Sequence, residues 1–167
     1  PMFTGGFADR YGYKKTLFFA VTMNIVGYVM MAYMTSYFGF FSGILVLATG
    51  TAFFKPALQG SLAASVSDKN SSLGWGIFYW VVNIGAVTAP QLAGAIRTVS
   101  WRYLFLASAA ITALNYLMML TFKDVPSGAD KTLSPIKVFA RTMRNILEPR
   151  LIAWLLIMSC FWLMMYQ

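Results

Sequence analysis

Long stretches of the chain carry no charged residue, and their lengths match the thickness of a lipid bilayer. No charge occurs from Thr16 to Phe54, from Asn70 to Ile96, or from Tyr103 to Phe122. As a helix, the first stretch would extend about 58 Å, which is enough for two crossings of a hydrocarbon core. The polar break at residues 35–39 divides it. The pattern therefore predicts four membrane-spanning helices, at about 15–35, 39–66, 73–96 and 102–122.

The last part of the chain has a different character. Residues 123–150 are rich in charge and proline, which is typical of a loop, and their apolar positions allow one short amphipathic helix. Residues 151–167 are apolar again and would extend about 26 Å, slightly less than a full crossing. Because position 1 is Pro and the final apolar run is short, we interpret the chain as a piece cut within hydrophobic segments at both ends.

The composition supports a membrane protein. Hydrophobic residues make up 59% of the chain and charged residues 11%, whereas a soluble domain carries about a quarter charged residues. The chain has no His, and its one Cys160 lies in an apolar run, so we expect no metal site, disulfide, cofactor or His-based catalysis. The net charge of +8 is dispersed between apolar stretches, which argues against nucleic acid as a partner.

Lys and Arg gather in alternate connections between the expected spans. The first, third and fifth carry most of them, whereas the remaining connections carry only Arg97 and Arg102. The positive-inside rule then places the Lys- and Arg-rich loops in the cytoplasm. We expect a multi-pass protein of the plasma (inner) membrane, with the lipid bilayer as its surroundings.

The segment before the first span reads GGFADRYGYKKTL over residues 5–17. It resembles the loop between the second and third helices of the major facilitator superfamily, although Tyr13 stands where that family usually has a basic residue. The resemblance implies that this loop braces one helix bundle against the other and biases the outward-facing state. The residues concerned are Gly5, Asp9, Arg10, Gly12, Lys14 and Lys15. An ordinary loop with positive-inside charges is the simpler alternative.

This alignment predicts the fold class: an all-α, polytopic transmembrane helix bundle with a partial major facilitator fold. Residues 1–122 would form part of the N-terminal bundle, which lacks its first helix. Residues 123–150 would form the cytoplasmic loop between bundles, and residues 151–167 the truncated first helix of the second bundle.

Lys55 is the only charged residue away from the ends of the expected spans. It lies about 24 Å along the helix from the break at Gly39, and burying its charge in lipid would cost about 2.5 kcal/mol or more. Snorkelling toward the cytoplasm is the alternative, but Asp68 lies about 20 Å further along. We expect Lys55 to face a water-filled cavity or a carboxylate from another helix. Pro56 beside it, and Pro90 in the next span, predict local helix kinks.

Two phrases narrow the resemblance to the proton-dependent oligopeptide transporter family. Residues 50–56 read GTAFFKP and residues 78–85 read FYWVVNIG, similar to that family's fourth- and fifth-helix signatures. Tyr79 and Asn83 stand four residues apart and share a helix face, where they offer a hydroxyl and an amide to a polar ligand. Hydrogen bonding between helices, with no substrate, is the alternative.

The final phrase, FWLMMYQ, looks like the same family's seventh-helix signature, in which an aromatic residue lines the peptide site. The resemblance implies that Trp162 is the aromatic residue that lines the peptide site. The family usually places an acid directly before the Gln, where this chain has Tyr166. That acid contributes to proton coupling, so its replacement leaves a carrier without proton coupling as one alternative.

We therefore expect a secondary active transporter that carries short peptides with protons by alternating access, using the proton gradient and no cofactor. Lys55, Tyr79, Asn83 and Trp162 would bind the di- or tripeptide, and missing helices of the same chain would supply acidic partners. The alternative is a carrier of another small solute, such as a drug, nitrate or a sugar. An enzyme or a scaffold has no supporting motif.

Overall fold

The computed structural model describes residues 8–121, 124 and 148–165. This part of the chain is helical, with no strand, and contains the following helices: α2 (Tyr13–Tyr33), α3 (Tyr37–Ser65), α4 (Ser71–Arg97), α5 (Trp101–Thr121) and α7 (Pro149–Met165). The first four are long and apolar enough to cross a membrane. The predicted fold class, an all-α polytopic transmembrane bundle, is confirmed.

Short polar connections separate the spanning helices. Ser36 begins α3 by accepting a hydrogen bond from the Gly39 N–H at 3.2 Å, which satisfies one of the amides left over at a helix start. The expected spans begin and end within two residues of the observed helices. Pro56 and Pro90 lie inside unbroken helices, and the kinks expected at both remain predictions.

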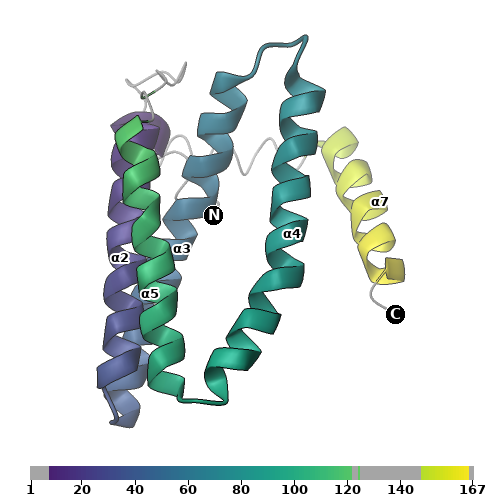
Figure 1. The fold of residues 1–167 in the computed structure, drawn as a ribbon. Helices are drawn as coiled ribbons and strands as arrows, with labels where there is room; N and C mark the ends of the chain where they lie inside the picture. Colours follow the sequence, from purple (N-terminus) through teal and green to yellow (C-terminus); the bar gives the residue numbers. More distant parts are fainter. Residues whose placement is uncertain (1–7, 122–123, 125–147, 166–167) are drawn as a thin grey trace.

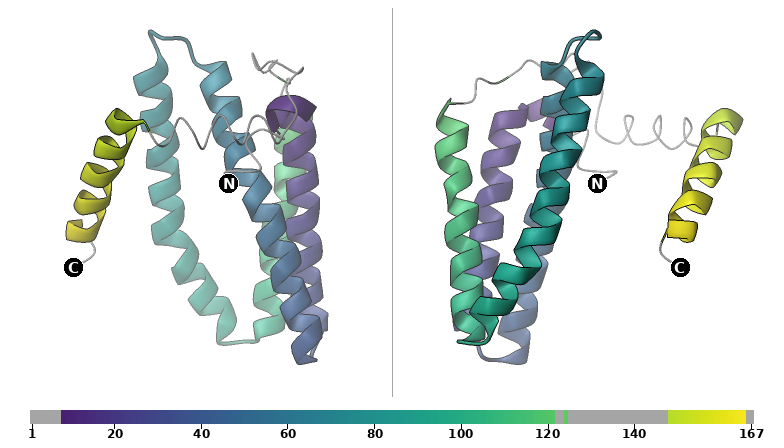
Figure 2. Two further views of the ribbon diagram at one scale, coloured as in Figure 1. Left: turned by 180° about the vertical axis from the view of Figure 1, so that it is seen from behind. Right: turned by 45° about the vertical axis from the view of Figure 1, so that its right-hand side comes forward.

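Helix α2 is the centre of the packing. It lies between α3 and α5 and contacts both along its length, whereas α4 has far fewer contacts with α3 and α5 (Figures 1 and 2). Helix α7 packs against none of the other described helices and stands apart from them in the right-hand view of Figure 2.

Small residues bring α2 and α3 into close contact. A Cβ atom placed on Gly27 would lie 2.8 Å from the backbone nitrogen of Leu47 and 3.0 Å from the carbonyl oxygen of Gly43. One placed on Gly50 would lie 2.8 Å from the Ala20 carbonyl oxygen. Small residues allow such an approach of helix backbones, which drives helix association where no hydrophobic effect operates.

Polar and aromatic contacts join α2 to α5. The hydroxyls of Thr22 and Tyr116 lie 2.7 Å apart, and Thr22 also donates to the Phe18 carbonyl at 2.8 Å, so the Tyr116 hydroxyl is the donor to Thr22. The Phe18 and Tyr116 rings are 4.9 Å apart. Both hydroxyls therefore have partners inside an apolar span.

The faces of α4 are apolar but uncovered. None of its residues is buried, and Trp80, Val87 and Ile77 are each more than half exposed. In water this surface would be a large apolar patch of the kind that marks a contact with a partner or a membrane. Lipid or further helices must cover it.

We predict that Gly27→Ala destabilises the protein by about 1–3 kcal/mol, because the added methyl group pushes α2 and α3 apart. Thermal unfolding of the purified complete protein in detergent measures this. Gly76→Ala in α4 is the matched control, since a Cβ there meets nothing within 4 Å. Equal melting temperatures for the two variants would contradict the close contact.

Candidate functional site

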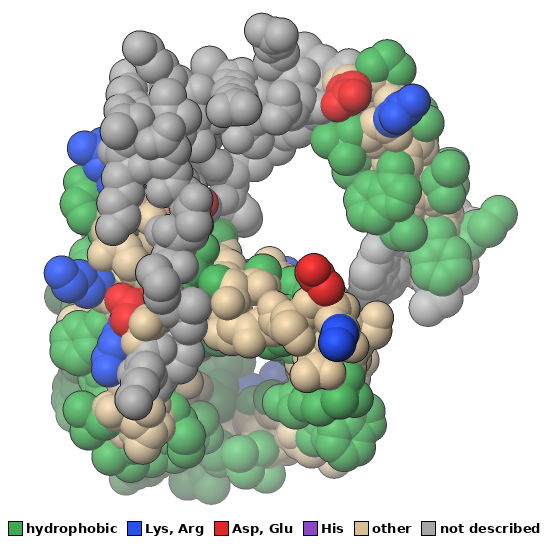
Figure 3. Space-filling view, turned by 90° about the horizontal axis from the view of Figure 1, so that it is seen from above, with side chains coloured by type: hydrophobic (Ala, Val, Ile, Leu, Met, Phe, Trp, Pro, Cys, Tyr) green, Lys and Arg blue, Asp and Glu red, His purple; other side chains and the backbone are tan. Residues whose placement is uncertain are grey.

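The expected signature loop lies at the end of the bundle where α2 begins. Residues 8–11 form a helical turn, and Gly12 donates to the Ala8 carbonyl at 3.0 Å before α2 starts at Tyr13. Gly12 has φ +97°, a conformation that side chains with a Cβ rarely adopt. Seen from this end, several Lys, Arg, Asp and Glu side chains gather on the surface (Figure 3). Gly5 lies outside the described residues.

Asp9 is tied to α2 and, through it, to α3. It accepts a hydrogen bond from the Tyr13 hydroxyl at 2.8 Å. The Tyr13 ring is buried against Gly60 of α3, where a Cβ would lie 2.6 Å from the ring. Tyr13 stands where a basic residue would be usual, and it connects the loop to α3 instead.

Asp124, which follows α5, lies on the start of α2. Its carboxylate accepts from the Lys14 N–H at 3.2 Å, and its other oxygen lies 3.0 Å from where a Cβ of Gly12 would be. Helix α2 has no acid in its first turn and no side-chain cap of its own. Asp124 therefore supplies the negative charge that a helix start favours. Sequence reasoning missed this residue, because nothing local links it to a partner 110 positions away.

The basic residues of the loop face outward. Arg10 is exposed, with its guanidinium 5.9 Å from the Tyr11 ring centre, and Lys15 is exposed on the first turn of α2. These positions suit contact with another part of the protein or with anionic lipid headgroups.

Lys55 lies on α3, inside the candidate span, and its side chain is exposed. The end of the helix at Ser65 is about 15 Å further along the axis. Among the described residues, no carboxylate forms an ion pair with Lys55.

Tyr79 and Asn83 lie on α4 and are both exposed. The Tyr79 ring is close to those of Trp75 and Phe78, with centres 6.2 Å and 5.4 Å away. No hydrogen bond in the described part of the chain joins Tyr79 or Asn83 to Lys55. Trp162 belongs to α7, but its side chain, like Tyr166, lies outside the described residues.

Metal chemistry has no site within the described ranges. No three side chains of His, Cys, Asp or Glu come together there as metal ligands would. Cys160 is exposed on α7.

The structure thus combines four apolar spans, a charged loop that folds onto the start of α2, and an exposed lysine within one of the spans. These are features of a multi-pass membrane protein. The chain belongs to the Major Facilitator Superfamily, whose family model matches residues 1–167.

Several curated proteins resemble the chain at modest identity. It is 28% identical over 69% of its length to the uncharacterized transporter YclF of Bacillus subtilis, and 28% identical over 53% to a di-/tripeptide transporter of Lactobacillus helveticus. It is 29% identical over 72% to a Na(+), Li(+), K(+)/H(+) antiporter of Planococcus maritimus. The matched regions cover 24%, 18% and 30% of these relatives.

We predict that Asp124→Ala lowers the stability of the complete protein by about 1 kcal/mol, the usual effect of losing a helix cap. Asp124→Asn keeps an acceptor oxygen and should lose less. Asp68→Ala, in the exposed connection between α3 and α4, removes the same charge as a control. Thermal unfolding measures the stability of the three variants. A loss of stability in Asp68→Ala as large as that in Asp124→Ala would contradict the capping role of Asp124.

Proposed function

We propose that the complete protein is a secondary transporter that carries short peptides together with protons by alternating access. The observation that carries this proposal is the exposed Lys55 at membrane depth on α3. Two helical bundles would rock around a site near the middle of the membrane, as in other transporters built from repeated helix groups.

The position of Lys55 argues for a water-filled site. An ammonium group facing hydrocarbon costs about 2.5 kcal/mol or more, and the described helices give it no acidic partner. A cavity between bundles would remove this cost, and a carboxylate from the rest of the protein could pair with Lys55 when no substrate is present. The carboxyl end of a peptide would replace that partner during transport.

Helix α4 offers groups for the rest of a peptide. The exposed Tyr79 hydroxyl can donate and accept hydrogen bonds, and the exposed Asn83 amide can do both as well. The neighbouring Trp75 and Phe78 rings would accommodate apolar peptide side chains. Trp162 would add an aromatic wall from α7.

Relatives that are named as peptide transporters support this choice of cargo. One is the Lactobacillus helveticus di-/tripeptide transporter. Another is the peptide transporter YePEPT of Yersinia enterocolitica, which is 27% identical over 60% of this chain and is itself matched over 21% of its length. Under this proposal Asp9 and Arg10 act in gating, on the cytoplasmic side of a plasma (inner) membrane, and no cofactor takes part.

We predict that Lys55→Ala abolishes accumulation of labelled di- and tripeptides by cells that express the complete protein, because the peptide carboxylate loses its partner. Lys55→Arg should keep part of the activity. Lys69→Ala, in the exposed connection after α3, is the control for loss of a positive charge. Accumulation by Lys55→Ala equal to that of Lys69→Ala, at equal surface expression, would rule out the role of Lys55.

A second candidate keeps the fold and changes the cargo or the coupling. Tyr166 stands where the resembling family usually carries an acid, which favours a carrier without proton coupling. A tetracycline resistance protein of Pasteurella multocida is 27% identical over 70% of the chain, which makes a drug or another small solute a reasonable alternative cargo.

The energy source distinguishes the two candidates. In proteoliposomes that contain the complete protein, a proton symporter should accumulate peptide when the outside is acidic and the membrane potential is clamped at zero. Dissipating the pH gradient under the same clamp should reduce accumulation to equilibration. If the reconstituted protein still exchanges peptide across the membrane but its uptake does not depend on the pH gradient, the carrier without proton coupling is favoured.

A further inference from the structure

Three polar residues follow one another at every fourth position along α3. They are Thr51, Lys55 and Gln59, and we call them the polar stripe. Residues four apart share a helix face, so the polar stripe extends along one side of α3 for about two turns. The proposed function uses only Lys55 of the three. The other two are polar groups in an otherwise apolar span, and each needs a partner.

The polar stripe lies on the side of α3 that is turned away from α2. Gly50 and Ala57 form the buried side that packs on α2. Because each residue turns a helix by about 100°, Lys55 stands about 140° and Gln59 about 180° from Gly50. At this end of the bundle α3 lies between α2 and α4 (Figures 1 and 2). Lys55 and Gln59 are therefore on the same side of α3 as α4.

Thr51 has its partners within the bundle. Its hydroxyl lies 3.0 Å from the Leu47 carbonyl oxygen and 3.4 Å from the side-chain oxygen of Asn24 on α2. A hydroxyl has one proton to donate, and the Leu47 carbonyl accepts it at the shorter distance. Thr51 is thus explained by the contact between α2 and α3.

Gln59 differs from Thr51 in this respect. Its side chain is partly exposed, and no hydrogen bond joins its amide to another described residue. A primary amide inside a span loses its hydrogen bonds to water, which is costly unless other polar groups replace them. Gln59 is therefore the member of the polar stripe that requires a polar partner beyond the described helices.

Gln59 lies at the depth of the groups that the proposed function assigns to the peptide. The connection at residues 66–70 joins α3 to α4, so distances along both helices can be counted from the same end. Gln59 and Lys55 lie about 9 Å and 15 Å from this end of α3. Tyr79 and Asn83 lie about 12 Å and 18 Å from the start of α4. The four side chains thus belong to one layer, about 9 Å thick along the helices.

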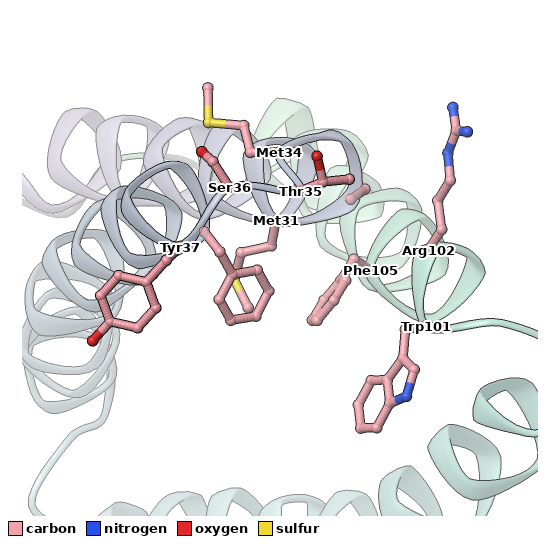
Figure 4. A pocket seen from close by; sticks show the side chains of 10 residues that line it. Met31, Met34, Thr35, Ser36, Tyr37, Trp101, Arg102 and Phe105 are labelled. Atoms are coloured by element: carbon pink, nitrogen blue, oxygen red, sulfur yellow. The ribbon is translucent and has the colours of Figure 1, made fainter.

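A cavity of about 720 Å³ lies at the opposite end of the bundle, outside this layer. The α2–α3 turn and the start of α5 line it, and Figure 4 shows that Arg102 extends away from Trp101 and Phe105. Tyr37, which also lines this cavity, is about 33 Å from Gln59 along α3. The polar stripe and this cavity therefore have no residue in common.

We propose that Gln59 binds the last peptide bond of the transported peptide while Lys55 binds its carboxylate. This inference rests on the proposed function. In a peptide the last N–H is separated from the carboxylate carbon by only the Cα atom, and Gln59 and Lys55 are about one turn apart, so one ligand reaches both. The Gln59 oxygen accepts from the peptide N–H, as an amide oxygen does. Gln59 thereby selects peptides over carboxylates that have no amide.

An ester analogue tests this selection. In alanyl-lactate an oxygen atom replaces the N–H of alanyl-alanine, while the amino group and the carboxylate remain. Both compounds are titrated into the purified complete protein by isothermal titration calorimetry. We expect the unchanged protein to bind alanyl-alanine about five- to tenfold more tightly than the ester, since the ester leaves the Gln59 oxygen without its donor. Gln59→Leu should reduce this preference to about twofold or less.

Two further variants support the comparison. Gln59→Asn keeps the amide on a shorter side chain and should keep part of the preference for alanyl-alanine. Thr51→Val removes the polar group on the other side of Lys55 and should keep all of it, because the Thr51 hydroxyl is bound within the bundle. If Gln59→Leu melts at a lower temperature than the unchanged protein, the comparison rests on Gln59→Asn, and a full preference there would overturn the proposal.

The outcomes distinguish this inference from the proposed function. A full preference in a stable Gln59→Leu protein, equal losses of affinity for both compounds, or an unchanged protein that binds both equally would overturn the role of Gln59 and leave the peptide cargo in place. An unchanged protein that binds neither compound would overturn the peptide cargo, and this inference with it.

Discussion

The structure depends on one constraint: the hydrocarbon core of a bilayer offers no water to backbone amides and carbonyls. Each unsatisfied group there costs several kcal/mol, so a spanning segment must satisfy its own backbone as a helix. This explains why α2 to α5 run unbroken through Pro56 and Pro90, and why Thr hydroxyls within the spans donate to carbonyls of their own helix. It also explains how α4 can exist with no buried residue, because lipid or other helices replace the water that it would otherwise meet.

The same constraint gives Lys55 its importance. Several polar groups inside the α2 and α5 spans have partners within the bundle, as with Thr22 and Tyr116, which stabilise the contact between those helices. Lys55 has no hydrogen-bond or ion-pair partner among the described residues. A cation in this position is consistent with a helix that lines an aqueous route, and the membership of the chain in a transporter superfamily agrees with that interpretation.

Much of the fold could be predicted from the sequence, because the length of a charge-free stretch and the polar residues that end it are local signals. The spans agree within two residues for this reason. The position of Lys55 within a span could be predicted in the same way, from the number of residues between it and the ends of that span. The contacts of Asp124 with Gly12 and Lys14, and of Tyr13 with Gly60, could not be predicted, because they depend on how distant segments meet. How Lys55 lies relative to Tyr79 and Asn83 could not be derived either, because that distance is set by the packing of α3 against α4.

The central claim is that position 55 faces water inside the membrane, and cysteine accessibility tests it most directly. In the complete protein with Cys160→Ser, Lys55→Cys is treated with a small, charged thiol reagent that does not cross the membrane, beside Leu114→Cys on the exposed apolar face of α5. The account predicts rapid modification at position 55, slowed by a saturating transported peptide, and almost none at position 114. Modification at position 55 as slow as at position 114 would show that Lys55 faces lipid or protein, and would contradict the account.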